Sequence, residues 1–590
     1  MAEKGAFEVD HEQIASLVQS TYLNTIPPRG AKPGTKSNGR IEWSVLAGYI
    51  LSYTTPDHTH PQYALISLAT GLKCLPYTSL PPNGDVLHDQ HAEVLARRGA
   101  RLWLLQRLEH EVKSSTIGEG FRFFERTARK GENESERKWK LRQGVKLHLY
   151  VSTLPCGDAS NNLLEFQRAA QDQIAGRMDV PTPAELLALH STTKNTSYGA
   201  SSAFTSNSGG GGSVVRGRAS SSNPAATHTA SGSAGSLRTK PGRPDSPPSI
   251  SMSCSDKLAL WNAPGIGIQG SLLSALLEPA FIYSISIADH PIRHIFPAFP
   301  LPSSAEEVHI EQQREDLKTI LAEDCKRALQ RARTNTDDEI IVGWSTTPFA
   351  DSKEVKLESA WSSFDSAHPF NADTGLAEKM EVFRASYEPV TCSSSILYVR
   401  NSDFGSSSGK GKVENLATGT KLGAPTKRPK PKDPSAGLSE PLKPQARSSV
   451  CRLNYFQAFL AAYSAITGAE MIQDENERVT YIDAKEGAFG DGTREYRRRK
   501  EELFGGKKDA QRVLETFLKG ARDGTAIKGT QKDVVQEVIE EVAEQDEERE
   551  EEEAGRVGLL QGWLRTPSAL SQFDLNGRTT RTTHAHRLPS

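Results

Sequence analysis

Alternating hydrophobic and polar residues mark several short stretches of the chain. In residues 145–152 (VKLHLYVS), the side chains of Val145, Leu147, Leu149 and Val151 fall on one face, which is typical of a β-strand with one buried side. Four other stretches rich in apolar, aromatic and β-branched residues are also expected to be strands: 43–53, 63–70, 281–288 and 339–344.

Longer stretches with apolar residues every three or four positions predict helices. The clearest is 89–112, and further helices are expected at 451–470 and 508–521. Two shorter apolar runs, SDKLALWN (255–262) and GSLLSALLE (270–278), are also predicted to be helical. Because strands and helices alternate along the first part of the chain, we expect an α/β core followed by additional C-terminal helices.

Three segments have too few apolar residues to contribute to a packed core. Residues 192–250 and 404–448 are rich in Ser, Gly, Pro and Lys, and 532–553 ends in a long run of acidic residues. Such compositions favour disorder. We therefore expect one large domain, residues 40–575, that is interrupted by three disordered inserts.

The overall composition narrows the class of protein only slightly. A formal charge of −2 gives no general positive field for a nucleic acid. Six cysteines in 590 residues are too few for a disulfide framework, and the longest apolar stretch, 270–288, is broken by Glu-Pro. We expect an intracellular protein without a membrane span, in the cytoplasm, the nucleus or both. The basic run KRPKPK (427–432) is either a nuclear localisation signal or a chance run in a linker.

A His-Ala-Glu triplet near the start of the 89–112 helix is followed, far along the chain, by two separate cysteines. Cys156 comes directly after a predicted strand, and Cys254 lies in the segment MSCSDK. His91 with these two thiols is a three-ligand zinc set that leaves a fourth position for water, as catalytic sites do. Glu93 takes the place of the non-ligand carboxylate that moves protons in zinc deaminases.

Simpler roles exist for each of these fragments alone. A histidine at a helix start often only caps the helix or packs against it, and an isolated Pro-Cys pair is common. The ordered series of all three fragments is much harder to obtain by chance. The remaining cysteines are expected to be small buried thiols: Cys74, Cys325, Cys392 and Cys451.

Residues 265–270 (GIGIQG) match the glycine pattern of dinucleotide-binding proteins. In such proteins this pattern follows a strand and opens a helix. Here the preceding residues are predicted to form a helix and then a turn, so we expect no dinucleotide cofactor.

Four segments, in this order, together resemble the adenosine-to-inosine editase family: GDVLHDQHAEVLARR, PCGDAS, MSCSDKLALWN and GIQGSLLS. This family includes adenosine deaminases acting on RNA and the eukaryotic tRNA-specific adenosine deaminases. The resemblance extends from about residue 39 to 573 and is strongest to the tRNA-specific members. It implies a cytidine-deaminase-like α/β fold, in which helices flank a central mixed sheet, with zinc on His91, Cys156 and Cys254 and with Glu93 as the proton carrier.

The resemblance also implies a substrate. The expected reaction is hydrolytic deamination of adenosine to inosine in tRNA, at the position just 3′ of the anticodon of alanine tRNA, with Lys73 in contact with a substrate phosphate. The alternatives are deamination of another structured RNA or of cytidine, or a non-catalytic RNA-binding relative of the family. An intact Glu93 argues against the last of these.

Cations in the predicted core require a separate explanation. Arg98 lies seven residues, or two helical turns, after His91, and Lys257 lies three after Cys254, so both point toward the side of the zinc ligands. Buried cations need a compensating anion, and the family resemblance implies buried inositol hexakisphosphate. The resemblance implies that the following residues bind this anion or connect it to the zinc site by hydrogen bonds: Asp89, Arg97, Arg98, Lys257, Trp261, Ser271, Arg452, Tyr481, Lys485, Tyr496, Lys500 and Trp563. It places His88 near the anion or behind a zinc ligand.

Overall fold

The computed structural model describes residues 8–55, 60–114, 121–127, 138–174, 180–197, 215–216, 235–240, 247, 249–295, 304–333, 339–368, 376–402, 411–430, 440–469, 479–505, 559–560 and 563–579. A sheet of eight strands lies at its centre in the order β10-β9-β6-β2-β3-β12-β13-β14. The strands are β2 (Leu46–Tyr53), β3 (Gln62–Thr70), β6 (Lys146–Val151), β9 (Ile282–Ala288), β10 (Ile341–Ser345), β12 (Ser394–Val399), β13 (Lys412–Ala417) and β14 (Thr420–Lys421).

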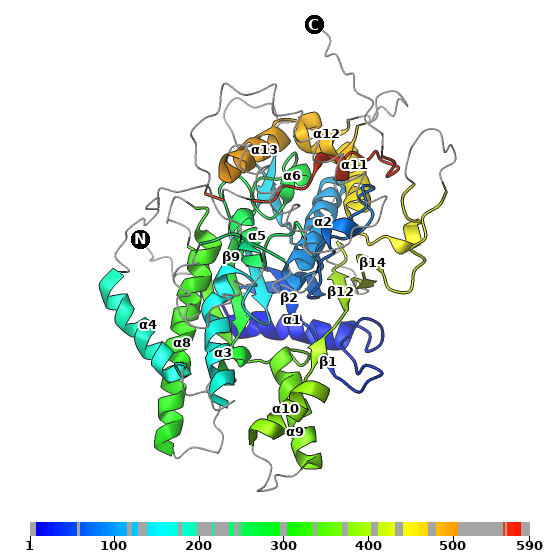
Figure 1. Ribbon diagram of the computed structural model, residues 1–590. Helices are drawn as coiled ribbons and strands as arrows, with labels where there is room; N and C mark the ends of the chain where they lie inside the picture. The colour runs from blue at the N-terminus through cyan, green and yellow to red at the C-terminus, as the bar shows by residue number, and fades with distance from the viewer. Residues whose placement is uncertain are drawn as a thin grey trace, which may run out of the picture.

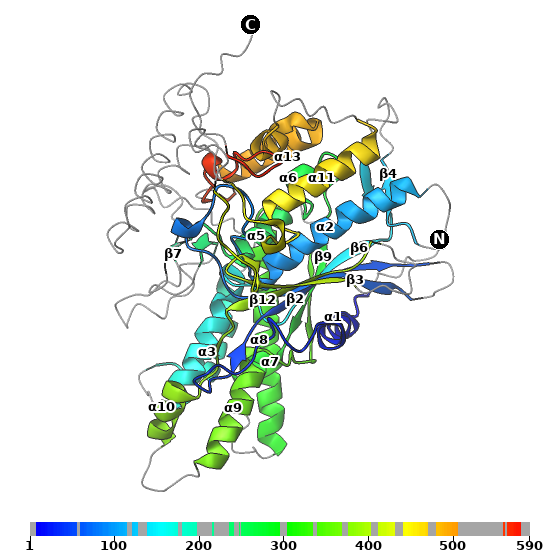
Figure 2. The same ribbon diagram turned by 90° about the vertical axis from the view of Figure 1, so that its right-hand side faces the viewer.

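Helices cover both faces of this sheet (Figures 1 and 2). The described helices are α1 (His11–Thr25), α2 (Ala92–Lys113), α3 (Asn161–Ile174), α4 (Pro183–Ser197), α5 (Cys254–Trp261), α6 (Gly270–Leu273), α7 (His290–Arg293), α8 (Ser304–Gln330), α9 (Lys353–Ala367), α10 (Leu376–Ser386), α11 (Arg452–Thr467), α12 (Tyr481–Asp483) and α13 (Asp491–Phe504). Short strand pairs join β1 (Glu42–Trp43) to β11 (Val390–Thr391), β4 (Phe124–Arg126) to β5 (Trp139–Leu141), and β7 (Val215–Arg216) to β8 (Arg238–Thr239).

The two faces of the sheet follow the alternation of residues along each strand. On β2, Ala47, Tyr49 and Leu51 pack into the core under α2, whereas Leu46 and Ile50 pack against α1 on the other face. Successive side chains of a strand point to opposite faces, and both faces are apolar here because helices cover both. Figure 2 shows α1 on one side of the strands and α2 with α11 on the other. The predicted mixed sheet flanked by helices is thus confirmed.

The parallel part of the sheet determines where the loops gather. Strand β6 pairs in parallel with β9, and β9 with β10, whereas β2 is antiparallel to both β3 and β6. The carboxyl ends of β6, β9 and β10 therefore lie at one edge of the sheet. The segments that begin at residues 152, 289 and 346 therefore leave the sheet at this edge.

The structure corrects several boundaries drawn from the sequence. The predicted domain began at residue 40, but α1 packs on the sheet through Ile14, Val18 and Tyr22. The predicted 404–448 insert contributes β13 and β14, and the end of the 192–250 insert is packed, with Lys240 3% exposed. Low-complexity composition concealed these short pieces because each is stabilised by pairing or ion contacts with other segments and not by an apolar pattern of its own. The predicted 508–521 helix and 532–553 insert lie outside the described residues.

The glycine-rich turn at 265–270 lies between α5 and α6 and follows a helix, as expected from the sequence. Gly265, Gly267 and Gly270 all have positive φ, between +66° and +79°, a conformation that glycine adopts without strain. The turn therefore reverses the chain after α5 and does not open the helix of a strand-helix-strand unit.

Part of the basic run at 427–432 is fixed to the body of the protein. Arg428 donates two hydrogen bonds to the buried carboxylate of Asp85, at 2.7 and 2.9 Å, and the backbone N–H of Leu442 donates a third. Because removal of a buried carboxylate leaves the cation without its partner, we expect Asp85→Asn to lower the free energy of unfolding by about 3 kcal/mol. Chemical denaturation measures this value, and Asp365→Asn, which removes an exposed partner of Lys379, should change it by less than about 1 kcal/mol.

No helix in the described part of the chain combines the length and the apolar run that a bilayer crossing requires.

Candidate active site

The start of α2 places the predicted imidazole and carboxylate side by side. His91 is the residue that precedes the helix, and Glu93 lies in its first turn. The Oδ1 atom of Asp89 accepts a hydrogen bond from His91 Nδ1 at 2.9 Å. In a neutral imidazole whose Nδ1–H faces a carboxylate, Nε2 has the lone pair that binds zinc.

The two predicted thiols meet from separate parts of the chain. Cys156 follows β6, and Cys254 is the first residue of α5, whose backbone N–H donates to Cys156 Sγ at 3.3 Å. A hydrogen bond from Cys254 lowers the pKa of Cys156 to about 6, whereas burial raises the pKa of Cys254. The positive end of α5 and the shared proton thus favour one thiolate. This donor set fits zinc, which binds thiolate and neutral imidazole.

His91, Glu93 and Cys156 line one pocket of about 300 Å³. Glu93 is only 3% exposed, so its carboxylate is largely shielded from bulk water. The pocket walls also include Trp43, Gly71, Leu163, Arg238, Lys240 and Glu354. Cys254 lies behind the pocket, 1% exposed and next to Cys156.

A buried ion network lies behind the predicted zinc ligands. Asp89 Oδ2 accepts from Lys240 Nζ at 2.9 Å, from Lys257 Nζ and from the hydroxyl of Ser251. Although burial opposes ionisation, the two ammonium groups hold the pKa of Asp89 well below its usual range. Lys240 Nζ also lies 3.1 Å from Cys254 Sγ. The network therefore orients His91 through Asp89 and supplies positive charge to the thiols.

Lys240 is the residue of this network that the sequence analysis missed. It lies in the segment LRTKPGRP, inside the predicted 192–250 insert, where a lysine before Pro-Gly resembles any linker lysine. The structure positions it through β8, because Thr239 forms a bridge with Met252, two residues before Cys254. The only sequence signal for Lys240 was the position of the basic segment LRTKPGRP shortly before MSCSDK.

Most of the residues assigned to the anion lie on α2, α6, α11, α12 and α13. These helices gather above the sheet (Figure 1). We define the cation cluster as Arg97, Arg98, Arg101, Arg452, Lys485, Lys500 and Arg565. Burial and the neighbouring positive charges lower the pKa of Arg97 to about 9, of Lys485 to about 8 and of Lys500 to about 7. The sequence assignment did not include Arg101 or Arg565.

Aromatic rings pack against several of these cations. Arg97 lies over the ring of Trp261 at 4.1 Å, and Lys485 over that of Tyr481 at 5.4 Å. Trp563 stacks on Phe504, which is itself 5.2 Å from Lys500 Nζ. Ser271 donates to the carbonyl of Lys485, and Tyr496 is buried close to Arg97. His88 Nδ1 accepts a hydrogen bond from the guanidinium of Arg452 at 3.2 Å.

In the part of the chain that the structure describes, few carboxylates lie close to Arg97, Arg98, Arg452, Lys485 and Lys500. Asp89 and Glu486 are the carboxylates that act on Arg98 and Lys485, but Asp89 already pairs with two lysines and Glu486 with Arg497. Within the described residues, Arg97, Arg98, Arg452, Lys485 and Lys500 thus bring together more positive than negative charge, which fits a ligand of high negative charge. Lys257 contacts Asp89 and thereby connects this region to His91.

Lys73 is close to the pocket but does not line it. It follows Gly71 and Leu72, which do, and its ammonium donates to the hydroxyl of Thr391 at 2.8 Å. A contact with a substrate phosphate stays a prediction.

Residues 67–296 match the adenosine-deaminase (editase) domain. Over this range the chain is similar to the editase family. His91, Glu93, Cys156 and Cys254 all lie inside the matched range, whereas the cation cluster includes residues beyond it. The matched range thus contains both thiols, whereas residues 43–45 and 352–354 of the pocket wall lie outside it.

Individual proteins with similar sequences include tRNA-specific adenosine deaminases and double-stranded RNA-specific editases. The chain is similar to tRNA-specific adenosine deaminase 1 of Schizosaccharomyces pombe, with 31% identity over 278 residues, 46% of this chain and 56% of that protein. It is 29% identical over 296 residues to the double-stranded RNA-specific editase Adar of Drosophila melanogaster, 49% of this chain and 35% of that protein. For human tRNA-specific adenosine deaminase 1 the identity is 26% over 428 residues, 57% of this chain and 80% of that protein. The chain spans about half the length of the yeast relative and less of Adar.

Proposed function

We propose that the protein is a hydrolytic deaminase that converts adenosine to inosine in tRNA. The observation that carries this proposal is the shared pocket, in which Glu93 lies beside His91 and Cys156 at the start of α2. The similarity to tRNA-specific adenosine deaminases of yeast and human supports tRNA as the substrate. We further infer that the sheet with α2 and α5 forms a cytidine-deaminase-like zinc core.

The proposed roles of the residues follow from their chemistry. His91, Cys156 and Cys254 would hold zinc, which when bound supplies a Lewis acid that lowers the pKa of a water molecule. Glu93 accepts one proton from the attacking water and delivers it to the purine N1. It then accepts the second proton from the new hydroxyl on carbon 6 and delivers it to the leaving amino group, so that adenosine and water yield inosine and ammonia. Asp89 fixes the ring of His91. The target base must leave its stack to enter the pocket.

The position within the substrate is the finer part of the proposal: the adenosine just 3′ of the anticodon in alanine tRNA. Purified protein is incubated with an alanine-tRNA transcript, and inosine is measured by sequencing. We expect inosine at this position and none in a transcript that carries guanosine there. Inosine or uridine formed only at other positions, or in other RNAs, would contradict the assignment.

We also propose that the cation cluster holds inositol hexakisphosphate. The anion would join α11, α12 and α13 to α2 and α5, because its phosphates would contact cations from both parts of the chain. Acid extraction of the purified protein followed by ion chromatography should release this compound in about equal amount to the chain. Extraction that releases no polyphosphate would contradict the proposal.

The cluster also predicts a pH dependence for protein from which the anion has been removed. Lys485 and Lys500 have pKa values of about 8 and 7 in the fold, below the value of about 10.4 that an unfolded lysine has. The unfolded chain therefore binds more protons between pH 7 and 10, and the free energy of unfolding of the stripped protein should rise as the pH rises from 7 to 9. Denaturation at each pH measures this change, and protein loaded with the anion should show a much smaller one.

A further inference from the structure

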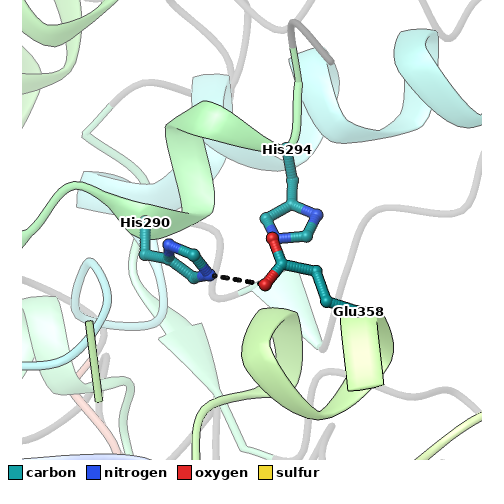
Figure 3. Close-up of side chains that lie close together, drawn as sticks. All are labelled: His290, His294 and Glu358. Carbon is teal, nitrogen blue, oxygen red and sulfur yellow. Dashed lines mark ion pairs between the residues drawn. The ribbon is translucent and has the colours of Figure 1, made fainter. Parts of the chain in front are cut away.

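A second group of side chains that could hold a metal ion lies outside the pocket of His91, Glu93 and Cys156, which we call the editase pocket. Figure 3 shows this second group. His290 and His294 lie one helical turn apart on α7 and its end, just after β9, and Glu358 faces them from α9. One nitrogen of each histidine and a carboxylate oxygen of Glu358 all lie within 4.8 Å of one another. Among the described residues, these three are the group of His, Cys, Asp or Glu side chains whose possible ligand atoms lie this close together.

The carboxylate of Glu358 bridges the two rings. Its Oε1 atom lies 2.9 Å from His294 Nε2, and its Oε2 atom lies 3.6 Å from His290 Nε2. The second distance is too long for a hydrogen bond, and His290 Nε2 is buried without a hydrogen-bond partner. The two rings are inclined by 77° with centroids 5.1 Å apart, so both nitrogens point toward the same space beside the carboxylate, as Figure 3 shows.

We propose that His290, His294 and Glu358 form a second zinc-binding site. Two imidazoles and one carboxylate suit zinc and its neighbours in the first transition series, and they suit Mg²⁺ or Ca²⁺ poorly, because those ions prefer oxygen ligands. Burial, the largest effect, lowers the pKa of His294 to about 4. Its ring is therefore neutral at pH 7, which is the form that binds metal. Three protein ligands leave one position for water.

The place of this site in the fold indicates that it would hold α9 against the sheet. The first turn of α9 provides Glu354 to the wall of the editase pocket, and Glu358 lies one turn later on the same helix. A metal ion on His290, His294 and Glu358 would join α9 to the loop that leaves β9, at the edge where the chain leaves β6 toward Cys156. The site would thus hold one wall of the pocket in position, and it shares no ligand with His91, Cys156 or Cys254.

Equilibrium dialysis against buffered micromolar zinc, followed by metal analysis, tests the proposal on the full chain. We expect about two zinc ions per wild-type chain and one fewer in the double variant His290→Gln/His294→Gln. The matched control is His309→Gln, which changes an exposed histidine on α8 and should bind as much zinc as the wild type. Equal zinc in all three proteins would overturn the proposal, whether or not the editase pocket binds metal.

Glu358→Gln provides a second test that is less sensitive to folding, because this side chain is 54% exposed. We expect its zinc affinity at the second site to fall at least about tenfold. Cobalt replaces zinc as a spectroscopic probe: the double variant should lose cobalt but keep the sulfur-to-cobalt charge-transfer bands of the thiol site. A double variant that loses those bands but keeps its remaining cobalt would contradict the assignment to His290, His294 and Glu358.

Discussion

Glu93→Gln should reduce the rate of adenosine deamination by about a thousandfold. The amide keeps the size of the side chain and its hydrogen bonding but cannot accept the proton of water or return it to the base. Because Glu93 is buried in the pocket, no neighbouring carboxylate on α2 takes its place. Single-turnover kinetics on a tRNA transcript, with inosine as the readout, measures the effect.

This prediction has a matched control and a clear contrary result. Glu109→Gln changes a carboxylate on the same helix that pairs at the surface with Lys113, and we expect a rate within about twofold of the wild type. Zinc content and tRNA affinity should be unchanged in Glu93→Gln, because this side chain is not a proposed ligand. A Glu93→Gln protein that makes inosine at more than a tenth of the wild-type rate would show that another group carries the proton.

Lys500→Met should lower the free energy of unfolding by about 3 kcal/mol if the cation cluster holds a polyanion. The substitution preserves most of the apolar stem and its packing on Phe504 and removes only the charge. Without an anion, the same change would relieve repulsion from Lys485, Arg565 and Arg97 and would raise stability. The sign of the change therefore distinguishes the two accounts.

Chemical denaturation measures this stability, and ion chromatography of the same sample measures the anion that is released. We expect less inositol hexakisphosphate from Lys500→Met than from the wild type. Lys113→Met, which removes an exposed lysine on α2, should change the free energy of unfolding by less than about 1 kcal/mol. A Lys500→Met protein more stable than the wild type would refute the buried anion.

The parts of the fold that could be predicted from sequence are those in which the local pattern and the tertiary environment agree. The strand at 145–152 and the helix at 89–112 lie within a few residues of β6 and α2, because apolar periodicity directly reflects burial. The predicted 270–278 helix is only one turn long, Gly270–Leu273, since the chain must turn again to reach β9. Strand β13 was missed because its partner, β12, lies beyond a stretch of low complexity.

The residues of the candidate site also divide into those that a local sequence pattern predicts and those that depend on contacts between distant segments. His91, Glu93 and Cys156 could be found because their spacing follows the start of a helix and the end of a strand. Lys240 could not, since its role depends on a bridge between Thr239 and Met252 that joins two ends of an insert. The His290, His294 and Glu358 group was also missed, because β9 and α9 bring these residues together across more than sixty positions of sequence.

The most direct test of the proposed function is inosine mapping on total tRNA incubated with the purified, zinc-loaded protein. The account predicts inosine at the adenosine 3′ of the anticodon in alanine tRNA, absent when Glu93→Gln replaces the wild-type protein. Folded protein with a full complement of zinc that produces no inosine in any tRNA would contradict it.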